Sequence, residues 1–558
     1  MPYMKKSDDR LLFLPLGGSG EIGMNLNLYA HKGKWLMVDC GMSFADEHFP
    51  GVDLVFPDPT FIEREKGQLL GLVVTHGHED HIGAIPHIWR RFECPIYATP
   101  FTAALITDKL AEASLLDEVQ LHIVEHDGPF ELGPFTISYL ALAHSTAEGH
   151  GLVIETGKGT IFHTGDWKLD PNPLIGPICP STKLKTLGDK GVLAMVGDST
   201  NVFNPENAGS ELAVRESLID ICKDRTGRIV LTTFASNVAR LDTAGEVAKA
   251  TGRHIVLLGR SMQRITKAAK ATGYLKNFPD VLNEEDASHI PRDKILILCT
   301  GCQGENRAAL ARIARNDHKH LTLAADDTVI FSSKIIPGNE LVLGQLFNTL
   351  ASNHIRVITE KDAFVHVSGH PGQADLKDMY GWVRPHIAIP VHGEARHLIA
   401  HAALARSAGI GRTIVPANGD IIEIEQSGAR KIDEAPVGRM ILDGDQVIPA
   451  DSPAMGDRRR ASQQGFITAS IVLEEDGELA AEPRLAVLGL PTINSDIFYD
   501  KLLGACEIAM DRMKPKQRLR DDSVEEVVRV SLRRLCRSTL GKNPGVAVLI
   551  SRLEDEHY

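Results

Sequence analysis

The feature that most constrains the fold is a cluster of histidines and acidic residues directly after an apolar run. The run Leu69–Thr75 leads into His76-Gly77-His78-Glu79-Asp80-His81. Imidazole and carboxylate groups are suitable ligands for zinc or manganese, and a turn at the end of a strand can direct several of them into one pocket. A single histidine could instead cap a turn or lie satisfied at the surface. Because His76, His78, Asp80 and His81 lie so close together, we predict that they bind metal.

A site for two metals needs further ligands, and the sequence offers three. His144 follows the apolar run Phe135–Leu142, Asp166 follows Thr160–Thr164, and His392 follows Pro390 and Val391. Each of these residues alone is as consistent with a capping or buried role as with metal ligation. Each of these residues comes just after a strand, so all three could lie together at one edge of a sheet sandwich. Together they supply the further ligands that a site for two metals needs.

The first 445 residues show two different sequence patterns. Early in the chain, short β-branched and apolar runs are broken by Gly-rich turns, which is typical of a sandwich of sheets. These runs are Leu11–Leu16, Trp35–Val38, Leu70–Thr75, Phe135–Leu142, Leu152–Thr156 and Thr160–His163. From about residue 213, strands alternate with long helical patterns, which indicates a parallel sheet with helices on its faces. These runs are Arg228–Thr233, Asn237–Ala250, His254–Leu258, Ser261–Thr272, Lys294–Thr300 and Thr328–Ser332.

The chain then returns to His-bearing turns, so we predict one domain inserted into another. A strand is expected at Ala363–Val367. The predicted boundaries are 1–212 and 358–445 for the two parts of the first domain and 213–357 for the insertion. We expect a linker at 446–465, because Pro449–Gly465 is rich in turn residues. Residues 466–558 should form a small α+β domain, with a helix at Ser523–Cys536 opened by a capping box of Ser523 and Glu526.

The ligand pattern resembles the metallo-β-lactamase superfamily, in which an HxHxDH motif is followed by a His, an Asp and a late His. The resemblance implies an αββα sandwich holding two divalent cations, with zinc expected and manganese or magnesium as alternatives. By motif match, one metal takes His76, His78 and His144, the other takes Asp80, His81 and His392, and Asp166 bridges them. Asp39 matches an early aspartate that orients a histidine ligand, although it could instead cap a turn.

The insertion resembles the β-CASP group of nucleases, and more specific motifs resemble the ribonuclease J family. These motifs lie at Leu16–Gly23, Asp198–Asn201, Phe234–Asn237, Gly259–Met262, Ile336–Glu340, His366–His370 and Pro390–Glu394. The resemblance covers about residues 11 to 445. It implies a hydrolase acting on RNA, a 5′-to-3′ exonuclease that prefers a 5′-monophosphate and also cuts internally, with roles in mRNA decay and rRNA maturation.

Roles for individual residues follow from the same motif match. Asp80, Asp166 and His370 are the expected catalytic residues, and His370 is a candidate proton donor to the leaving 3′-oxygen, with a satisfied turn histidine as the alternative. Substrate phosphate is expected at Ala235, Ser236, Asn237, His366, Val367, Ser368, Gly369 and His370. Hydroxyl, amide, imidazole and backbone N–H groups can all donate to phosphate oxygens.

The overall charge of −13 argues against a protein coated in positive charge, but RNA needs only a local basic surface. Between Val247 and Pro279 there are no acidic residues, and the cations there are Lys249, Arg253, Arg260, Arg264, Lys267, Lys270 and Lys276. This stretch is a plausible track for single-stranded RNA. For the outlying lysines a solvated helix face is an equal alternative, whereas Arg260 lies inside a family motif.

Composition and cysteine usage predict the cellular location of the chain and the redox state of its cysteines. The chain has 8 scattered cysteines, consistent with a reducing compartment, and the pair Cys299 and Cys302 is better explained as buried small residues than as redox or zinc chemistry. No signal-peptide pattern or membrane-length apolar stretch is present, so a cytoplasmic location is expected. The family also implies a homodimer supported by the C-terminal region.

Other functions remain open on the sequence alone. One is a β-CASP nuclease directed at DNA. A hydrolase of small esters is also possible, but the insertion disfavours it. Another is an RNA-binding scaffold with a vestigial metal site, which the complete set of ligand candidates disfavours.

Overall fold

The computed structural model describes residues 3, 7–125, 128–178, 181–491 and 495–553. It divides into two compact units. Unit 1 comprises residues 1–43 and 55–438, and unit 2 comprises residues 44–54 and 439–558. Two short strands, β5 (Ser43–Phe44) and β6 (Leu54–Pro57), contain the sequence boundaries between them. Within the described parts of the chain, none of the helices is both long and apolar enough to cross a lipid bilayer.

Unit 1 contains two sheets that face each other across one core. The first sheet has the order β25 (Gly428–Glu434), β24 (Asp420–Glu425), β1 (Leu11–Gly17), β3 (Leu26–His31), β4 (Lys34–Val38), β7 (Leu69–Val73), β8 (Ile96–Ala98) and β9 (Leu121–Ile123). The second has the order β10 (Phe130–Leu132), β11 (Phe135–Ala141), β12 (His150–Thr156), β13 (Gly159–His163), β14 (Ala194–Asp198), β21 (Ile387–Val391) and β23 (Arg412–Thr413). Apolar side chains from both sheets, including Phe13, Val73, Phe135 and Ile389, form the shared core.

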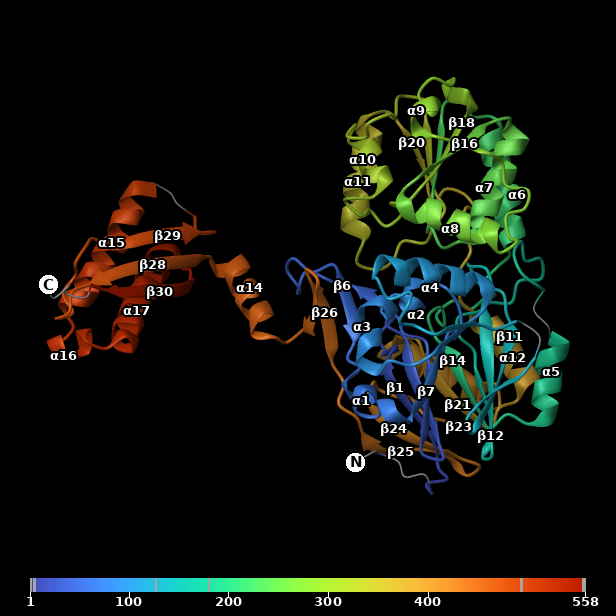
Figure 1. Ribbon diagram of the computed structural model, residues 1–558. Helices are drawn as coiled ribbons and strands as arrows, with labels where there is room; N and C mark the ends of the chain where they lie inside the picture. Colours follow the sequence, from blue (N-terminus) through green and yellow to red (C-terminus); the bar gives the residue numbers. More distant parts are fainter. Residues whose placement is uncertain (1–2, 4–6, 126–127, 179–180, 492–494, 554–558) are drawn as a thin grey trace. The chain divides into compact units, whose positions relative to one another are not determined.

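Helices cover the outer face of each sheet (Figure 1). Along the first sheet lie α1 (Thr60–Arg64), α3 (Ile85–Phe92) and α4 (Pro100–Glu112), with the 3-10 turn Lys66–Gln68 and the short α2 (Glu79–Ile82) nearby in sequence. Against the second sheet pack α5 (Ser181–Lys190), α12 (Gln373–Val383) and α13 (Ala395–Ser407), which bury Leu184, Met379 and Leu404. The result is the four-layer αββα sandwich expected from the sequence.

The third sheet of unit 1 is parallel throughout. Its order is β17 (Val281–Leu282), β16 (His254–Leu258), β18 (Ile295–Cys299), β15 (Ile229–Thr232), β19 (Thr328–Phe331) and β20 (Arg356–Ile358). In Figure 1, α10 (Ala309–Ala314) and α11 (Glu340–Ser352) lie on one side, and α6 (Glu211–Lys223) and α7 (Val238–Thr251) on the other. Shorter or edge elements are α8 (Arg260–Ala271), α9 (Glu284–Ala287) and the 3-10 turn Arg292–Lys294. This is the predicted βαβ insertion, here called the inserted lobe.

Unit 2 has its own core. Strand β28 (Phe466–Leu473) pairs antiparallel with β29 (Arg484–Leu488) and parallel with β30 (Gly545–Arg552). Helices α15 (Ser495–Asp511) and α17 (Asp521–Leu540) pack on one face of this sheet, and α16 (Pro515–Arg518) connects them. A hairpin of β26 (Arg439–Asp443) and β27 (Gln446–Pro449) precedes α14 (Pro453–Gln464).

Three local predictions differ from the structure. Ala363–Val367 is not a strand, because the carbonyl of Val365 accepts hydrogen bonds from side chains rather than from a neighbouring strand. Residues 453–464 of the predicted linker form α14, since Pro453 in the first turn is compatible with a helix. The capping box at Ser523 is wrong: α17 already begins at Asp521, after Arg520.

The described cysteines are all buried and unpaired, Cys299 and Cys302 among them. This confirms the interpretation of that pair as small core residues. Cys179 lies outside the described residues.

Candidate metal centre

The predicted ligands converge at one edge of the sandwich because each follows the carboxyl end of a strand. His76 to His81 follow β7, His144 follows β11, Asp166 follows β13, and His392 follows β21. The ligand-type atoms form three groups, within each of which all atoms lie within 4.8 Å of one another. The groups are His76, His78, His144 and Asp166; Asp80, His81, Asp166 and His392; and Asp166, Asp198, His370 and His392. Asp166 is common to all three.

Distances place Asp166 between the first two groups. Its Oδ2 lies 3.8 Å from both His76 Nε2 and His144 Nε2, and 3.2 Å from His81 Nε2. Its Oδ1 lies 2.7 Å from His392 Nδ1. One carboxylate thus contacts both sets of imidazoles, which is the geometry that a bridging ligand requires.

The donor set suits two divalent cations. Among the described residues, the Nε2 atoms of His76 and His78 are buried and make no hydrogen bond. A buried imidazole nitrogen without a partner is costly, and a metal ion would satisfy it. Neutral imidazoles and ionised carboxylates are also the forms that bind metal.

Electrostatics favour these protonation states for most of the ligands. Burial lowers the pKa of His76 and His144 well below the usual histidine value, and lowers that of His78 to about 4. Burial by itself would raise the pKa of Asp166, but His392 and His81 outweigh it and hold that pKa well below its usual range. Burial opposes protonation of His392 too, yet Asp166 raises its pKa to about 10. A cation bound at His392 therefore has to displace a proton.

Asp39 contacts His81 on the ring nitrogen that faces away from Asp166, whereas Asn25 contacts the nitrogen that faces it. Asp39 is fully buried in a left-handed conformation (φ 61°) and lies 2.7 Å from His81 Nδ1. Its Oδ1 also accepts the backbone N–H of Thr75 at 2.8 Å. This is the contact expected of a carboxylate that fixes the orientation of a ligand ring. Asn25 Nδ2 lies 3.2 Å from both the Asp80 carbonyl oxygen and His81 Nε2.

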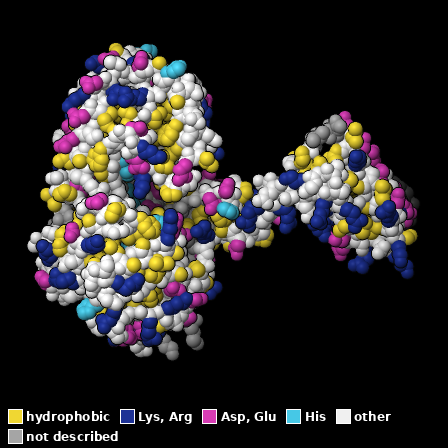
Figure 2. Space-filling view, turned by 180° about the vertical axis from the view of Figure 1, so that it is seen from behind, with side chains coloured by type: hydrophobic (Ala, Val, Ile, Leu, Met, Phe, Trp, Pro, Cys, Tyr) yellow, Lys and Arg dark blue, Asp and Glu magenta, His cyan; other side chains and the backbone are white. Residues whose placement is uncertain are grey.

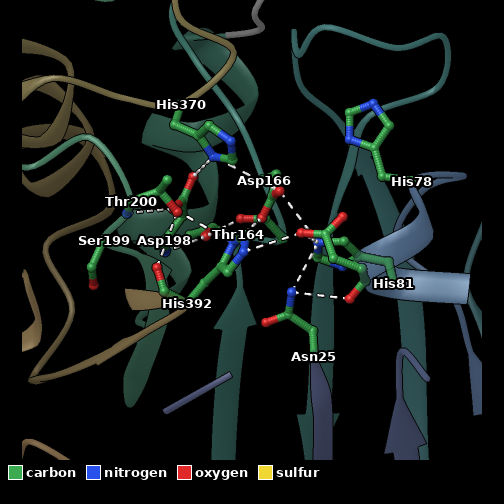
Figure 3. Close-up of polar contacts among 12 residues, drawn as sticks. Asn25, His78, His81, Thr164, Asp166, Asp198, Ser199, Thr200, His370 and His392 are labelled. Carbon is green, nitrogen blue, oxygen red and sulfur yellow. Dashed lines mark hydrogen bonds and ion pairs between the residues drawn. The ribbon is translucent and has the colours of Figure 1, made fainter. Parts of the chain in front are cut away.

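In Figure 3, His370 lies on the other side of Asp166 from His78 and His81. Its Nδ1 is 2.8 Å from Asp198 Oδ2, and its side chain is 24% exposed, whereas that of Asp166 is 3% exposed. Burial lowers the pKa of His370, but the Asp198 carboxylate outweighs this effect and raises it above the usual value. Because Nδ1 contacts Asp198, a proton that His370 transfers would lie on its other ring nitrogen.

The sequence alone does not single out Asp198, although it begins the motif Asp198–Asn201. It ends β14, next to β13 and β21 in the sheet, so it had the same strand-end signal that identified Asp166 and His392.

The expected phosphate contacts come from two segments. Ala235 and Ser236 form a partly exposed turn after β15, while Asn237 is buried and its Oδ1 accepts the backbone N–H of Arg240 at 2.9 Å, capping α7. In the segment His366–His370, the Gly369 carbonyl lies 2.6 Å from His144 Nδ1, and the Ser368 hydroxyl accepts the N–H of His370 at 3.0 Å. Val367 is buried.

The basic stretch does not form one continuous track. Arg260 is exposed at the start of α8, as an RNA contact would require. Arg253, however, is buried and donates to backbone carbonyls, and Arg264 pairs with Glu79 and Glu112. In Figure 2 lysine and arginine side chains are scattered over the visible face of unit 1, and histidines are visible in the recess between its lobes.

Comparison with protein families covers most of the chain. Residues 24–231 match the metallo-beta-lactamase superfamily, residues 226–350 the "Ribonuclease J, beta-CASP domain", residues 354–416 the "Zn-dependent metallo-hydrolase RNA specificity domain", and residues 453–553 the "Ribonuclease J C-terminal domain". These matches confirm the predicted fold class.

Curated relatives match most of this chain. Ribonuclease J of Sinorhizobium meliloti is 40% identical over 98% of both chains. Ribonuclease J of Corynebacterium glutamicum is 38% identical over 85% of this chain and 66% of its own. A crystal structure of a protein of unknown function from Enterococcus faecalis shares the fold, with a TM-score of 0.51 and 14% identity over 75% of this chain and 100% of its own.

Proposed function

Because the chain belongs to the ribonuclease J family, we propose that it is a metal-dependent hydrolase that cleaves RNA phosphodiesters. The observation that carries the proposal is the position of Asp166, which contacts both imidazole groups while the pair of His370 and Asp198 stands beside it. Bound divalent cations supply Lewis acidity and an activated water for attack on phosphorus.

The proposed division of the ligands follows the motif match, and the two imidazole groups around Asp166 support it. His76, His78 and His144 would hold one cation, Asp80, His81 and His392 the other, and Asp166 both. Zinc is the first candidate, with manganese and magnesium as alternatives.

The protein's own groups then have separable tasks. His370 donates a proton to the departing 3′-oxygen, and Asp198 keeps its ring in the orientation that this transfer needs. Ser236 and the backbone N–H groups of residues 366–369 bind phosphate oxygens, which holds the scissile bond beside Asp166 and His370. Exposure of Asp80 (30%) and His370 (24%), against 3% for His392, indicates that substrate approaches from their side.

We further propose 5′-to-3′ exonuclease action on single-stranded RNA with a 5′-monophosphate, with internal cleavage as a second mode. The support is the motif match at Ser236–Asn237 and His366–His370, two segments able to contact several phosphates at once. The test uses single-stranded RNA of one sequence carrying a 5′-monophosphate, 5′-triphosphate or 5′-hydroxyl, labelled at its 5′ or its 3′ end.

Release of labelled mononucleotide from the 5′ end, fastest from the monophosphate, is expected with zinc, manganese or magnesium. The Asp80→Ala variant serves as the inactive control. Equal cleavage of a DNA strand of the same sequence would favour the DNA-directed alternative. RNA binding without cleavage under any of the metals would favour the scaffold.

A further inference from the structure

Four charged side chains are buried together where the inserted lobe joins the sandwich. They are Lys168, Asp170, Glu211 and Arg240, each at most 2% exposed. Lys168 Nζ lies 3.4 Å from Asp170 Oδ2 and 3.7 Å from Glu211 Oε1, and Arg240 Nη2 lies 2.9 Å from Glu211 Oε2. Two positive and two negative groups balance. Burial would raise the pKa of Glu211, but Arg240 and Lys168 lower it, so this carboxylate stays ionised.

A buried ion pair is weak evidence for stability, because desolvation of the charges offsets their attraction. Such a cluster is better explained as a device that fixes the relative positions of the segments that it joins. Its members come from three parts of the chain: Lys168 and Asp170 follow the metal-ligand candidate Asp166, Glu211 begins the helix that enters the inserted lobe, and Arg240 lies in the first turn of α7.

Arg240 also binds the segment by which the chain leaves the inserted lobe. Its Nη1 donates to the carbonyls of Ser332 at 3.1 Å and Val365 at 2.9 Å. The Ser332 hydroxyl donates to the same Val365 carbonyl at 2.6 Å. One guanidinium thus joins the incoming crossing at Glu211, the end of β19 at Ser332, and the outgoing crossing at Val365, the residue before His366.

These bonds connect the two segments proposed to hold RNA phosphates. Asn237 accepts the backbone N–H of Arg240, so Arg240 is fixed to the turn that contains Ser236. Val365 directly precedes the His366–His370 segment. His370 itself is anchored independently, through Asp198. Arg240 therefore sets the spacing between the two phosphate-contact segments without touching the catalytic groups.

We propose that Arg240 is a positioning residue for RNA binding, which holds the Ser236 turn and the His366–His370 segment at the separation that successive phosphates of one strand require. The proposal rests on the function proposed above. It makes a specific demand on chemistry: a planar guanidinium can bond Glu211 with one nitrogen and two carbonyls with another, whereas a lysine ammonium of similar charge cannot span these partners.

The test compares Arg240→Lys with the wild type in steady-state hydrolysis of a 5′-monophosphorylated single-stranded RNA. We expect KM to rise roughly tenfold, since hydrogen bonds to a charged group are lost, and kcat to stay within about twofold. Bound metal per chain should be unchanged.

Arg228→Lys is the matched control. Arg228 is also a buried arginine of the inserted lobe that donates to a backbone carbonyl, that of Thr322 at 2.8 Å. It precedes β15, whereas Ser332 follows the parallel neighbour β19, so it lies at the opposite end of the sheet. We expect this variant to lose stability with KM unchanged.

Ser332→Ala offers a milder probe in case Arg240→Lys does not fold. It removes the bond that the Ser332 hydroxyl donates to the Val365 carbonyl and the bond that this hydroxyl accepts from Arg240 Nη1. A rise in KM of about threefold is expected. Unchanged KM in a folded Arg240→Lys or Ser332→Ala, or equal KM changes in Arg240→Lys and Arg228→Lys, would overturn the inference alone. Absence of RNA hydrolysis by the wild type would overturn the proposed function and this inference with it.

Discussion

At the scale of single residues, the centre depends on carboxylates that hold imidazoles in fixed orientations. Asp39 orients His81, Asp166 joins the two imidazole groups, and Asp198 orients His370. The position of Asp166 just after a strand predicted it from the sequence, and the resemblance to the superfamily predicted Asp39. Asp198 also ends its strand, but no histidine lies next to it in the sequence, so the sequence does not show which histidine it contacts.

Replacing Asp198 with asparagine should act through His370. We expect kcat for RNA to fall about 100-fold or more, the usual contribution of a positioned acid, with KM changed little. His370→Ala should cause a similar loss, and the double variant should be no worse than His370→Ala, because both changes disable one function. His386→Ala, which alters an exposed histidine, is the control. Losses that multiply in the double variant would show that Asp198 acts separately from His370.

The stability of the fold should depend on pH through the buried His401. It is fully buried between the Ser199 hydroxyl and the Tyr380 hydroxyl, each at 2.8 Å, and burial lowers its pKa from 6.5 to about 4. Because the folded-state pKa lies below the unfolded value, protons favour the unfolded chain. The contribution to stability is complete above about pH 6.5 and is lost as the pH falls toward 4.

Between about pH 7.5 and about pH 5, His401 should account for a loss of about 2 kcal/mol of unfolding free energy. Chemical denaturation of unit 1 at both pH values measures this. In His401→Gln the pH-dependent loss should be smaller by about that amount, whereas His48→Gln, at an exposed position, should behave as the wild type. An unchanged pH dependence in His401→Gln would contradict the assignment.

At the scale of elements, most of the strands were predictable because apolar runs bounded by turn residues mark them. Leu11–Gly17 and His254–Leu258 follow the expected ranges closely. Ala363–Val367 failed because buried Val365 and Val367 alternate with other residues as in a strand, while the backbone bonds go to Arg240 and Ser332. The cluster of Lys168, Asp170, Glu211 and Arg240 was not predictable, since only the fold brings its distant members together.

The first turn of α7 should have two separable roles. Asn237→Ala removes the cap, which should cost about 1 kcal/mol of stability, and should also raise KM for RNA because the Ser236 turn loosens. Asn283→Ala removes the equivalent side-chain cap of α9, where Asn283 accepts the N–H of Asp286 at 2.7 Å. That variant should leave KM unchanged. Equal KM values for the two variants would show that the α7 turn has no part in RNA binding.

At the scale of the whole molecule, unit 2 presents a sheet face that its helices leave uncovered. Along β28 the buried positions alternate with partly exposed ones. Leu488 (67% exposed) pairs with Phe466, and Leu549 (59% exposed) with Ser470, both on the uncovered side. The homodimer expected from the family remains a proposal, and this face is where we place it.

Leu488→Glu combined with Leu549→Glu should convert a dimer to a monomer in light scattering after size-exclusion chromatography, because two charges would be buried in the contact. Leu341→Glu, at an 83% exposed position of unit 1, is the control and should stay dimeric. A wild type that is already monomeric would exclude this dimer.

We propose that Asp166 joins two cation sites and that the chain cleaves RNA only when both are occupied. The most direct test is to strip the chain of metal and titrate it with zinc or manganese while following both bound metal and RNA hydrolysis. Activity should rise to a plateau at about two equivalents per chain, and Asp166→Asn should bind less metal and stay inactive. Full activity in the presence of chelator, a plateau at one equivalent, or an active Asp166→Asn would contradict the claim.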